Sequence, residues 1–286
     1  MTRMEEFRAQ MAARMSALRT GDSVPVGSQG CAAAERANAE AQAAAYLTPM
    51  PEEFAQWLDA VRGSPHVRMN ASYSASAAKV QFNYLYDDDQ INAYAARDGQ
   101  GDGYRIVFYG GAIRFSRLAS LAVAVDMCGR PGTASRFAKS IDTGGMMSRK
   151  SALATMSECG LDESFALPGV RTKAQAVSAG MIIGILAHEM GHVCLGHVMG
   201  PNYYQSNQEI GRNHEREADS FASSITAATP FGEYVYEGML FWHYVLAQQQ
   251  GNEAVESTHP LERERLENLI RANSSKASAL GIGLPR

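Results

Sequence analysis

The segment His188-Glu189-Met190-Gly191-His192 has the residue types and spacing of a helical metal site. Residues four apart on a helix lie on one face, so His188 and His192 can converge on one zinc ion. Glu189 projects from the neighbouring position and can reach a water bound to that ion. We therefore predict that the two histidines bind zinc and that Glu189 is a general base. Taken singly, each histidine could instead be a structural residue of a buried helix.

A catalytic zinc needs a third protein ligand and keeps one coordination position open. The extended motif H-E-x-x-H-x-x-G-x-x-H, which supplies a third histidine, is absent. Leu195 stands at the position of its glycine and Val198 at that of its last histidine. The segment Glu215-Arg216-Glu217-Ala218-Asp219 offers two carboxylates four residues apart, on one helix face. One of Glu215 and Asp219 can bind the metal while the other hydrogen-bonds to a ligand histidine. Glu217 is expected to point away from both.

The motifs HEMGH and EREAD, followed by His259-Pro260 before a charged helix, resemble metallopeptidase family forty-eight. These are gluzincins of the HtpX, CAAX prenyl protease, BepA and OMA type. The resemblance implies that Glu215 is the third zinc ligand and that Asp219 hydrogen-bonds to a ligand histidine. It also implies that His259 and Arg265 lie near the metal.

The same resemblance extends to a hairpin upstream of the metal motif. Residues Asn92, Ala93 and Tyr94 look like the family's strand that pairs with the substrate backbone. In the implied mechanism Glu189 moves the proton of the attacking water, while His259 and Arg265 stabilise the oxyanion. The alternatives are a loop histidine at 259 and a solvated helix charge at 265. A resting state in which His259 occupies the open zinc position is a further hypothesis.

The remaining histidines look structural. His197 follows His192 by five residues, which on a continuing helix turns it about 140° away from the metal face. His214 adjoins Glu215 but faces away from it on a helix. Both are therefore expected to lie apart from the zinc chemistry.

The elements that must position these residues are mainly helical. We expect an α+β fold, with a small antiparallel sheet of hairpins beside the metal-binding helix; the resemblance makes it the gluzincin fold of zincins. Alternation of apolar and polar residues and glycine or aspartate turns predict the strands, and apolar periodicity predicts the helices. The expected strands cover 80–86, 91–95 and 104–109, and the expected helices 113–127, 173–199, 206–228, 231–250 and a segment ending near 273.

Three regions follow from this pattern. Residues 1–75 read as an N-terminal helical segment, 76–275 as the zinc metallopeptidase domain, and 276–286 as a flexible tail. Within the domain, 128–172 reads as a long loop or loosely helical insertion. It could be a lid over the site or a solvated loop without a role.

The bulk composition is that of a globular protein. The chain has 286 residues, 45% of them hydrophobic, and a net charge of −4 that gives no reason to expect a nucleic-acid partner. No continuous apolar run reaches the length of a transmembrane span, and the charged N-terminus does not resemble a secretory signal. These features predict a cytoplasmic protein, and the four cysteines read as free thiols.

The predicted function is a zinc endopeptidase with one Zn2+ per chain, acting on protein or peptide substrates. The alternative is a zinc-containing binding or chaperone-like module with little turnover. The full catalytic set favours the enzyme. The sequence does not indicate the oligomeric state, the physiological substrate or the cleavage preference.

Overall fold

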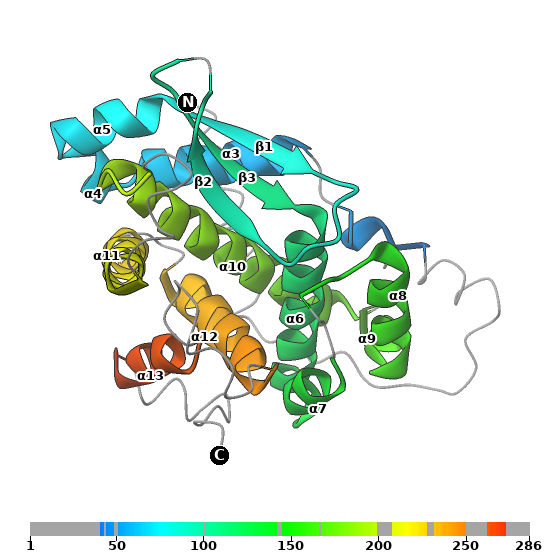
Figure 1. Ribbon diagram of the computed structural model, residues 1–286. Coiled ribbons are helices and arrows are strands. Elements are labelled where there is room, and N and C mark those ends of the chain that lie inside the picture. The colour runs from blue at the N-terminus through cyan, green and yellow to red at the C-terminus, as the bar shows by residue number, and fades with distance from the viewer. Residues whose placement is uncertain are drawn as a thin grey trace.

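A long central helix organises the fold (Figure 1). The computed structural model describes residues 41–42, 44–48, 51–99, 101–141, 145–165, 167–198, 208–227, 232–249 and 262–272. Within them, α10 (Pro168–Cys194) packs against helices on several sides, and a three-stranded sheet covers another. The fold is thus mainly helical α+β, as the sequence predicted.

The sheet is mixed, whereas the sequence predicted an antiparallel one. Its strands β1 (Val80–Leu85), β2 (Ala93–Arg97) and β3 (Tyr104–Tyr109) lie in the order β1-β3-β2. β2 and β3 pair antiparallel, but β1 pairs with β3 in parallel. The prediction that β1 and β2 form a hairpin is therefore wrong. The segment between them carries the chain from one edge of the sheet to the other.

Burial explains why β3 lies in the centre. Residues 106–108 are consecutive and all buried, which is typical of a strand covered on both faces. β1 alternates instead, and its Phe82 and Tyr84 rings each lie 4.7 Å from the ring of Phe54. The most continuously apolar strand therefore takes the position with two neighbours.

A buried arginine holds the connection that follows β1. Arg114 of α6 (Gly110–Met127) is 3% exposed and donates hydrogen bonds to the carbonyl oxygens of Tyr86 and Asp88. It also pairs with the Asp89 carboxylate at 2.5 Å. A guanidinium has enough donors to satisfy several carbonyl groups of one turn. Arg114 therefore fixes the path that brings the chain from β1 towards β2.

Helices α3 (Pro51–Arg62), α4 (Pro65–Arg68) and α5 (Ala71–Ala78) precede the sheet and pack into the same core. Ser64 caps α4 through the Val67 N–H, and Asn70 caps α5, which matches the preference of these residues for helix starts. The buried side chains of α3 belong to the same hydrophobic cluster as those of α10. The core thus continues across the boundary expected at residue 76.

The segment 128–172 folds into helices in its described part. These are α7 (Thr133–Ser140), α8 (Arg149–Glu158) and α9 (Leu161–Phe165), and all three pack against α6. Phe137 and Leu161 are fully buried, so this segment contributes to the core. In Figure 1 the three helices lie beside α6, on the other side of the molecule from α11. The described residues of this segment are therefore helices packed into the core, and a role as a lid stays a prediction.

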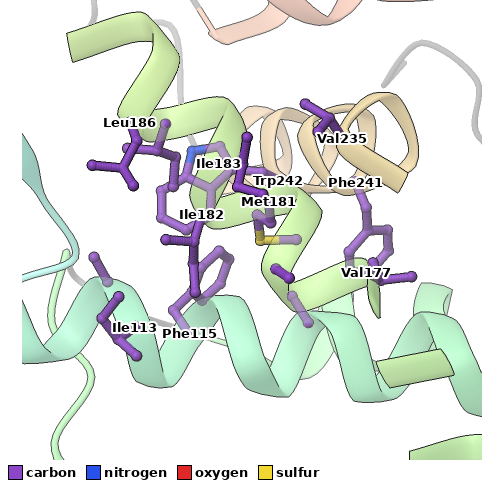
Figure 2. Close-up of a cluster of buried hydrophobic side chains, with 14 of the residues drawn as sticks. Ile113, Phe115, Val177, Met181, Ile182, Ile183, Leu186, Val235, Phe241 and Trp242 are labelled. Atoms are coloured by element: carbon purple, nitrogen blue, oxygen red, sulfur yellow. The ribbon is translucent and has the colours of Figure 1, made fainter. Parts of the chain in front are cut away.

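Apolar side chains of two other helices pack against the middle of α10 (Figure 2). Pro168 starts this helix, where a fixed φ angle and a missing N–H are both tolerated. Each fully buried aliphatic side chain contributes roughly 1.5–3 kcal/mol. The labelled core residues are Ile113 and Phe115 of α6, Val177, Met181, Ile182, Ile183 and Leu186 of α10, and Val235, Phe241 and Trp242 of α12 (Gly232–Gln249).

Helix α10 also has the length and composition of a membrane-spanning helix. Of the helices in the described ranges it alone passes this test, over Gly169–Cys194, and 89% of the tested window is buried inside the protein. Core helices of globular proteins pass the same test, and the burial of α10 is of that kind. The remaining elements are α11 (Gln208–Ala227) and α13 (Glu262–Ala272), which pack against α10 and α12 respectively.

Candidate metal centre

The last turns of α10 bring His188 and His192 to one face, as their spacing predicted. The two Nε2 atoms lie 3.1 Å apart, and the residues are 6% and 9% exposed. Glu189, between them in the chain, is 7% exposed. Both imidazoles therefore present the same nitrogen to one small buried space.

Glu215 of α11 reaches that space from the neighbouring helix. Its Oε2 lies 3.1 Å from Nε2 of His188, and its Oε1 lies 3.3 Å from Nε2 of His192. The three potential ligand atoms all lie within 4.8 Å of one another. The residues that the sequence proposed as metal ligands thus form one cluster, which could hold a metal ion.

A glycine within the motif allows α11 to approach so closely. A Cβ atom added at Gly191 would lie 3.1 Å from the Cα of Ala218, and it would also crowd Phe221. Such a contact is tighter than side chains normally make, so a larger residue would push the two helices apart. The small residues at 191 and 218 therefore set the distance at which Glu215 meets the histidines.

The other nitrogen of His188 is held by an acidic residue. Its Nδ1 lies 2.8 Å from Oδ1 of Asp219, and Arg265 of α13 contacts both carboxylate oxygens of Asp219 at 3.0 and 2.7 Å. Burial would raise the pKa of Asp219, but the Arg265 guanidinium and the His188 hydrogen bond outweigh it and hold the pKa well below its ordinary value. Asp219 is therefore a carboxylate that anchors the ring of His188.

Asp219 and Glu215 in turn act on the protonation of His188. Burial would lower the pKa of this imidazole, but its hydrogen bonds to the two carboxylates raise the pKa to about 10. Metal binding would have to displace that proton, because a ligand histidine binds through a free nitrogen lone pair.

The two residues predicted to stabilise an oxyanion have different outcomes. His259 lies outside the described residues. Arg265 is close to the cluster, but two of its nitrogens contact Asp219, and its side chain is 12% exposed. The contacts thus make Arg265 the anchor of Asp219, and its action on an oxyanion stays a prediction.

The strand predicted to bind substrate lies beside α10. Ala93 and Tyr94 begin β2, which contacts α10, whereas Asn92 precedes the strand, and its backbone carbonyl accepts a hydrogen bond from the Tyr109 N–H. In the described part of the chain β2 pairs only with β3, so it is an edge strand. At its end, Arg97 donates to the carbonyl oxygen of Val198, just after α10.

Sequence reasoning misplaced His197, because α10 ends earlier than expected. The helix stops at Cys194, and Gly196 adopts a left-handed conformation with φ of +76°. The Gly196 N–H donates to the Val193 carbonyl at 3.2 Å, and the His197 N–H donates to the His192 carbonyl at 2.8 Å. This is a Schellman turn, which reverses the chain over the last turn of the helix. The prediction that His197 points away from His192 is wrong.

His197, His214 and Glu217 form a second cluster next to the first. Nδ1 of His197 lies 3.3 Å from Nδ1 of His192, and Nε2 of His197 lies 2.9 Å from Oε2 of Glu217. The rings of His197 and His214 stack 4.0 Å apart with 3° between their planes. Burial and the neighbouring His214 and His192 lower the pKa of His197 to about 4, despite its hydrogen bond with Glu217. His197 is therefore a neutral imidazole at pH 7.

Comparison with known proteins adds no assignment. No protein-family model matches the chain, and no curated protein and no solved structure is significantly similar to it. The cluster of His188, His192 and Glu215 is therefore the feature of this chain that indicates a function.

Proposed function

We propose that this chain is a zinc-dependent endopeptidase of the gluzincin type, with the metallopeptidase family forty-eight motifs described above. One observation carries the proposal: Nε2 of His188, Nε2 of His192 and the Glu215 carboxylate converge within 4.8 Å, with Glu189 on the same helix. Two imidazoles and one carboxylate are the ligand set of several catalytic zinc sites. The gluzincin fold itself is part of this proposal.

The donor set fits zinc in a catalytic role. Nitrogen and oxygen donors from three side chains leave a fourth tetrahedral position for water or substrate. The ligand histidines both offer Nε2, and His188 has its Nδ1 held by Asp219 at 2.8 Å. A carboxylate behind a ligand histidine fixes the tautomer and makes the ring a better ligand.

Zinc at this site would polarise the scissile carbonyl and bring the pKa of water to about 7. Glu189 takes the proton from the attacking water and delivers it to the leaving amine. Its burial, at 7% exposure, keeps bulk water away from the carboxylate during that transfer. Asp219 and Arg265 keep His188 oriented throughout the reaction, and His259 remains a candidate for stabilising the oxyanion.

The proposed substrate is an extended segment of a protein or peptide. The edge strand β2 supports this, because an edge strand has backbone N–H and C=O groups that can pair with an added strand. Because β2 contacts α10, a substrate paired with it would lie beside the helix that carries the two histidines. A cytoplasmic site of action stays a prediction from the sequence.

The first test measures metal content and proteolysis together. Wild type should contain one zinc per chain by mass spectrometry and should cleave an unfolded, fluorescence-quenched protein. Glu189→Gln should keep the zinc and lose activity by about 100- to 10,000-fold, since it removes only the proton acceptor. Glu215→Ala should lose both the activity and most of the zinc.

The matched control is Glu209→Ala, which removes an exposed glutamate from the same helix as Glu215. It should retain both zinc and activity. A chain that binds no zinc would contradict the proposal. One zinc per chain with equal, negligible turnover in wild type and Glu189→Gln would favour a zinc-containing binding module.

A further inference from the structure

The second cluster, His197, His214 and Glu217, has residue types that can bind a metal, but its two imidazole rings are not oriented to share one ion. The ligand atoms of His197, His214 and Glu217 lie within 4.8 Å of one another. An imidazole binds a metal in the plane of its ring, through a nitrogen lone pair. The His197 and His214 planes are only 3° from parallel and stack 4.0 Å apart, so no single point lies in both. The contacts of His197 with His192 and Glu217 therefore need another explanation.

The positions of the hydrogens on the two imidazole rings explain these contacts. The Glu217 carboxylate can only accept, so the hydrogen in its 2.9 Å contact belongs to Nε2 of His197. A metal bound through Nε2 of His192 uses the lone pair there, so the hydrogen of that neutral ring lies on Nδ1. In the 3.3 Å contact between the two Nδ1 atoms, His192 is then the donor and His197 the acceptor. Nε2 of His192 lies 3.3 Å from the Glu215 carboxylate, so both groups would reach the same ion.

We propose that His197 is a positioning residue for the metal centre, which fixes the ring orientation and tautomer of His192 and is itself oriented by Glu217. The chain of contacts runs from Glu217 through His197 and His192 to the metal position. It deepens the proposed function and rests on it, because His192 must be a metal ligand for the tautomer to matter. A hydrogen-bond acceptor behind a ligand histidine typically strengthens metal binding 10- to 100-fold.

The backbone supports this role independently of the side chains. His192 and His197 are the two residues that a Schellman turn brings into contact, through the hydrogen bond from the His197 N–H to the His192 carbonyl. Apolar residues usually make that contact. Here it is polar, and His197 is 4% exposed, so solvent does not compete for its nitrogen atoms. The turn that ends α10 thus brings Nδ1 of His197, the acceptor, next to Nδ1 of His192, the donor.

Two variants of His197 separate hydrogen bonding from packing. His197→Phe keeps a ring to stack on His214 but removes both nitrogens, and should weaken zinc binding 10- to 100-fold in competition with a chromophoric chelator. His197→Asn offers an oxygen near the position of Nδ1 and should recover part of that loss. The control is His66→Phe, the same substitution at a ring that also packs against α11, 5.0 Å from Phe221. It should bind zinc as tightly as wild type.

A direct reading of tautomers tests the proposal without relying on the variants' folding. Long-range 1H–15N correlation spectra of the wild-type chain should show His197 with its hydrogen on Nε2 with and without zinc, and His192 with its hydrogen on Nδ1 once zinc is bound. His197 with its hydrogen on Nδ1 would overturn the proposal. So would a single zinc bound equally well by wild type and His197→Phe, or two zinc ions per wild-type chain with one lost in His197→Phe.

These readouts distinguish the two proposals. A wild-type chain that binds no zinc contradicts the proposed function, while the tautomer spectra still decide whether His197 has its hydrogen on Nε2, next to Glu217. Zinc binding that ignores His197 leaves the proposed function standing and removes only this inference.

Discussion

The two histidines of the candidate metal centre have different partners at their Nδ1 atoms. Nδ1 of His188 contacts the Asp219 carboxylate, which Arg265 grips through two contacts of 3.0 and 2.7 Å. Nδ1 of His192 contacts the neutral ring of His197. The charge behind that ring is on Glu217, whose side chain is 60% exposed, whereas Arg265 is 12% exposed.

This difference indicates how much each pair of residues, Asp219 with Arg265 behind His188 and His197 with Glu217 behind His192, should contribute to zinc affinity. Charged hydrogen bonds are strongest where solvent is excluded, and solvent screening weakens an exposed carboxylate. The Asp219 support also joins three helices, since His188, Asp219 and Arg265 come from α10, α11 and α13. The His197 support spans only the end of α10 and the adjacent α11. We therefore expect the His188 side to matter more for both stability and zinc affinity.

The largest effect is expected for Asp219→Ala. It leaves the mostly buried Arg265 guanidinium without its carboxylate, which should lower the free energy of unfolding by roughly 3 kcal/mol. It also removes the acceptor for Nδ1 of His188, so zinc affinity should fall about 100-fold. Urea unfolding of the metal-free chain and chelator competition measure the two effects separately.

An exposed pair on α13 provides the control for this comparison. Glu267 and Arg271 lie 3.1 Å apart, with the arginine side chain 73% exposed, so Glu267→Ala should change stability by less than about 0.5 kcal/mol. Asp219→Asn keeps an oxygen for His188 and should fall between wild type and Asp219→Ala in zinc affinity. Equal losses for Asp219→Ala and Glu267→Ala would show that Asp219 is no more important than a surface charge.

Of the residues that contact the two histidines, Glu215 and Asp219 could be predicted from the sequence, whereas His197 could not. Glu215 and Asp219 could be found because their four-residue spacing on one helix is a local property, and helix spacing fixes which residues share a face. Helix α11 was predicted to within two residues, expected over 206–228 and observed over Gln208–Ala227, whereas α10 begins and ends five residues earlier than the expected 173–199. Local periodicity thus accounts for the existence of both helices that carry the candidate ligands, but not for the end of α10.

What the sequence missed depends on contacts that are not local. The parallel pairing of β1 with β3 is determined by which strand is buried on both faces and by the Arg114 contacts with the β1–β2 connection. The place of His197 depends on one left-handed residue, Gly196, whereas the predicted helix continues through it to residue 199. The glycine was the available signal, since glycine is common just after a helix end.

A smaller effect is expected for Gly196→Ala, which tests the turn and leaves the hydrogen-bonding side chains intact. No atom lies within 4 Å of an added Cβ, so the strain comes only from the φ angle of +76°. Alanine in the left-handed region should lower the free energy of unfolding by roughly 1–2 kcal/mol. If residue 196 leaves the left-handed conformation, His197 moves away from His192 and the contact between their Nδ1 atoms is lost. Zinc affinity should then fall up to about tenfold.

Gly160→Ala is the matched control. Gly160 also has a positive φ, of +64°, and open space around an added Cβ, but it lies between α8 and α9, which Figure 1 shows on the other side of the molecule from α11. It should lose a similar amount of stability and keep the zinc affinity of wild type. Equal zinc affinity in both variants would mean that the turn does not position His197.

The smallest effect is expected for Glu217→Gln, at the exposed end of the weaker support. Glutamine keeps an oxygen that can accept from Nε2 of His197 and removes only the negative charge. Because His197 is neutral at pH 7, the native contact is a hydrogen bond to a carboxylate and no ion pair, and the carboxylate is largely solvated. Its loss should weaken zinc binding by about threefold or less, which corresponds to the energy of an exposed charged contact.

Comparing Glu217→Gln with Asp219→Asn decides whether burial is the reason for the difference between the two sides. Both substitutions replace a carboxylate by an amide of the same shape, one at 60% and one at 32% side-chain exposure. A larger loss of zinc affinity for Asp219→Asn follows if the buried Arg265 and the exclusion of solvent give the carboxylate its strength. Equal losses would mean that a carboxylate acts through a neutral imidazole as effectively as by direct contact, so that the relay through His197 transmits the full effect of Glu217 to His192.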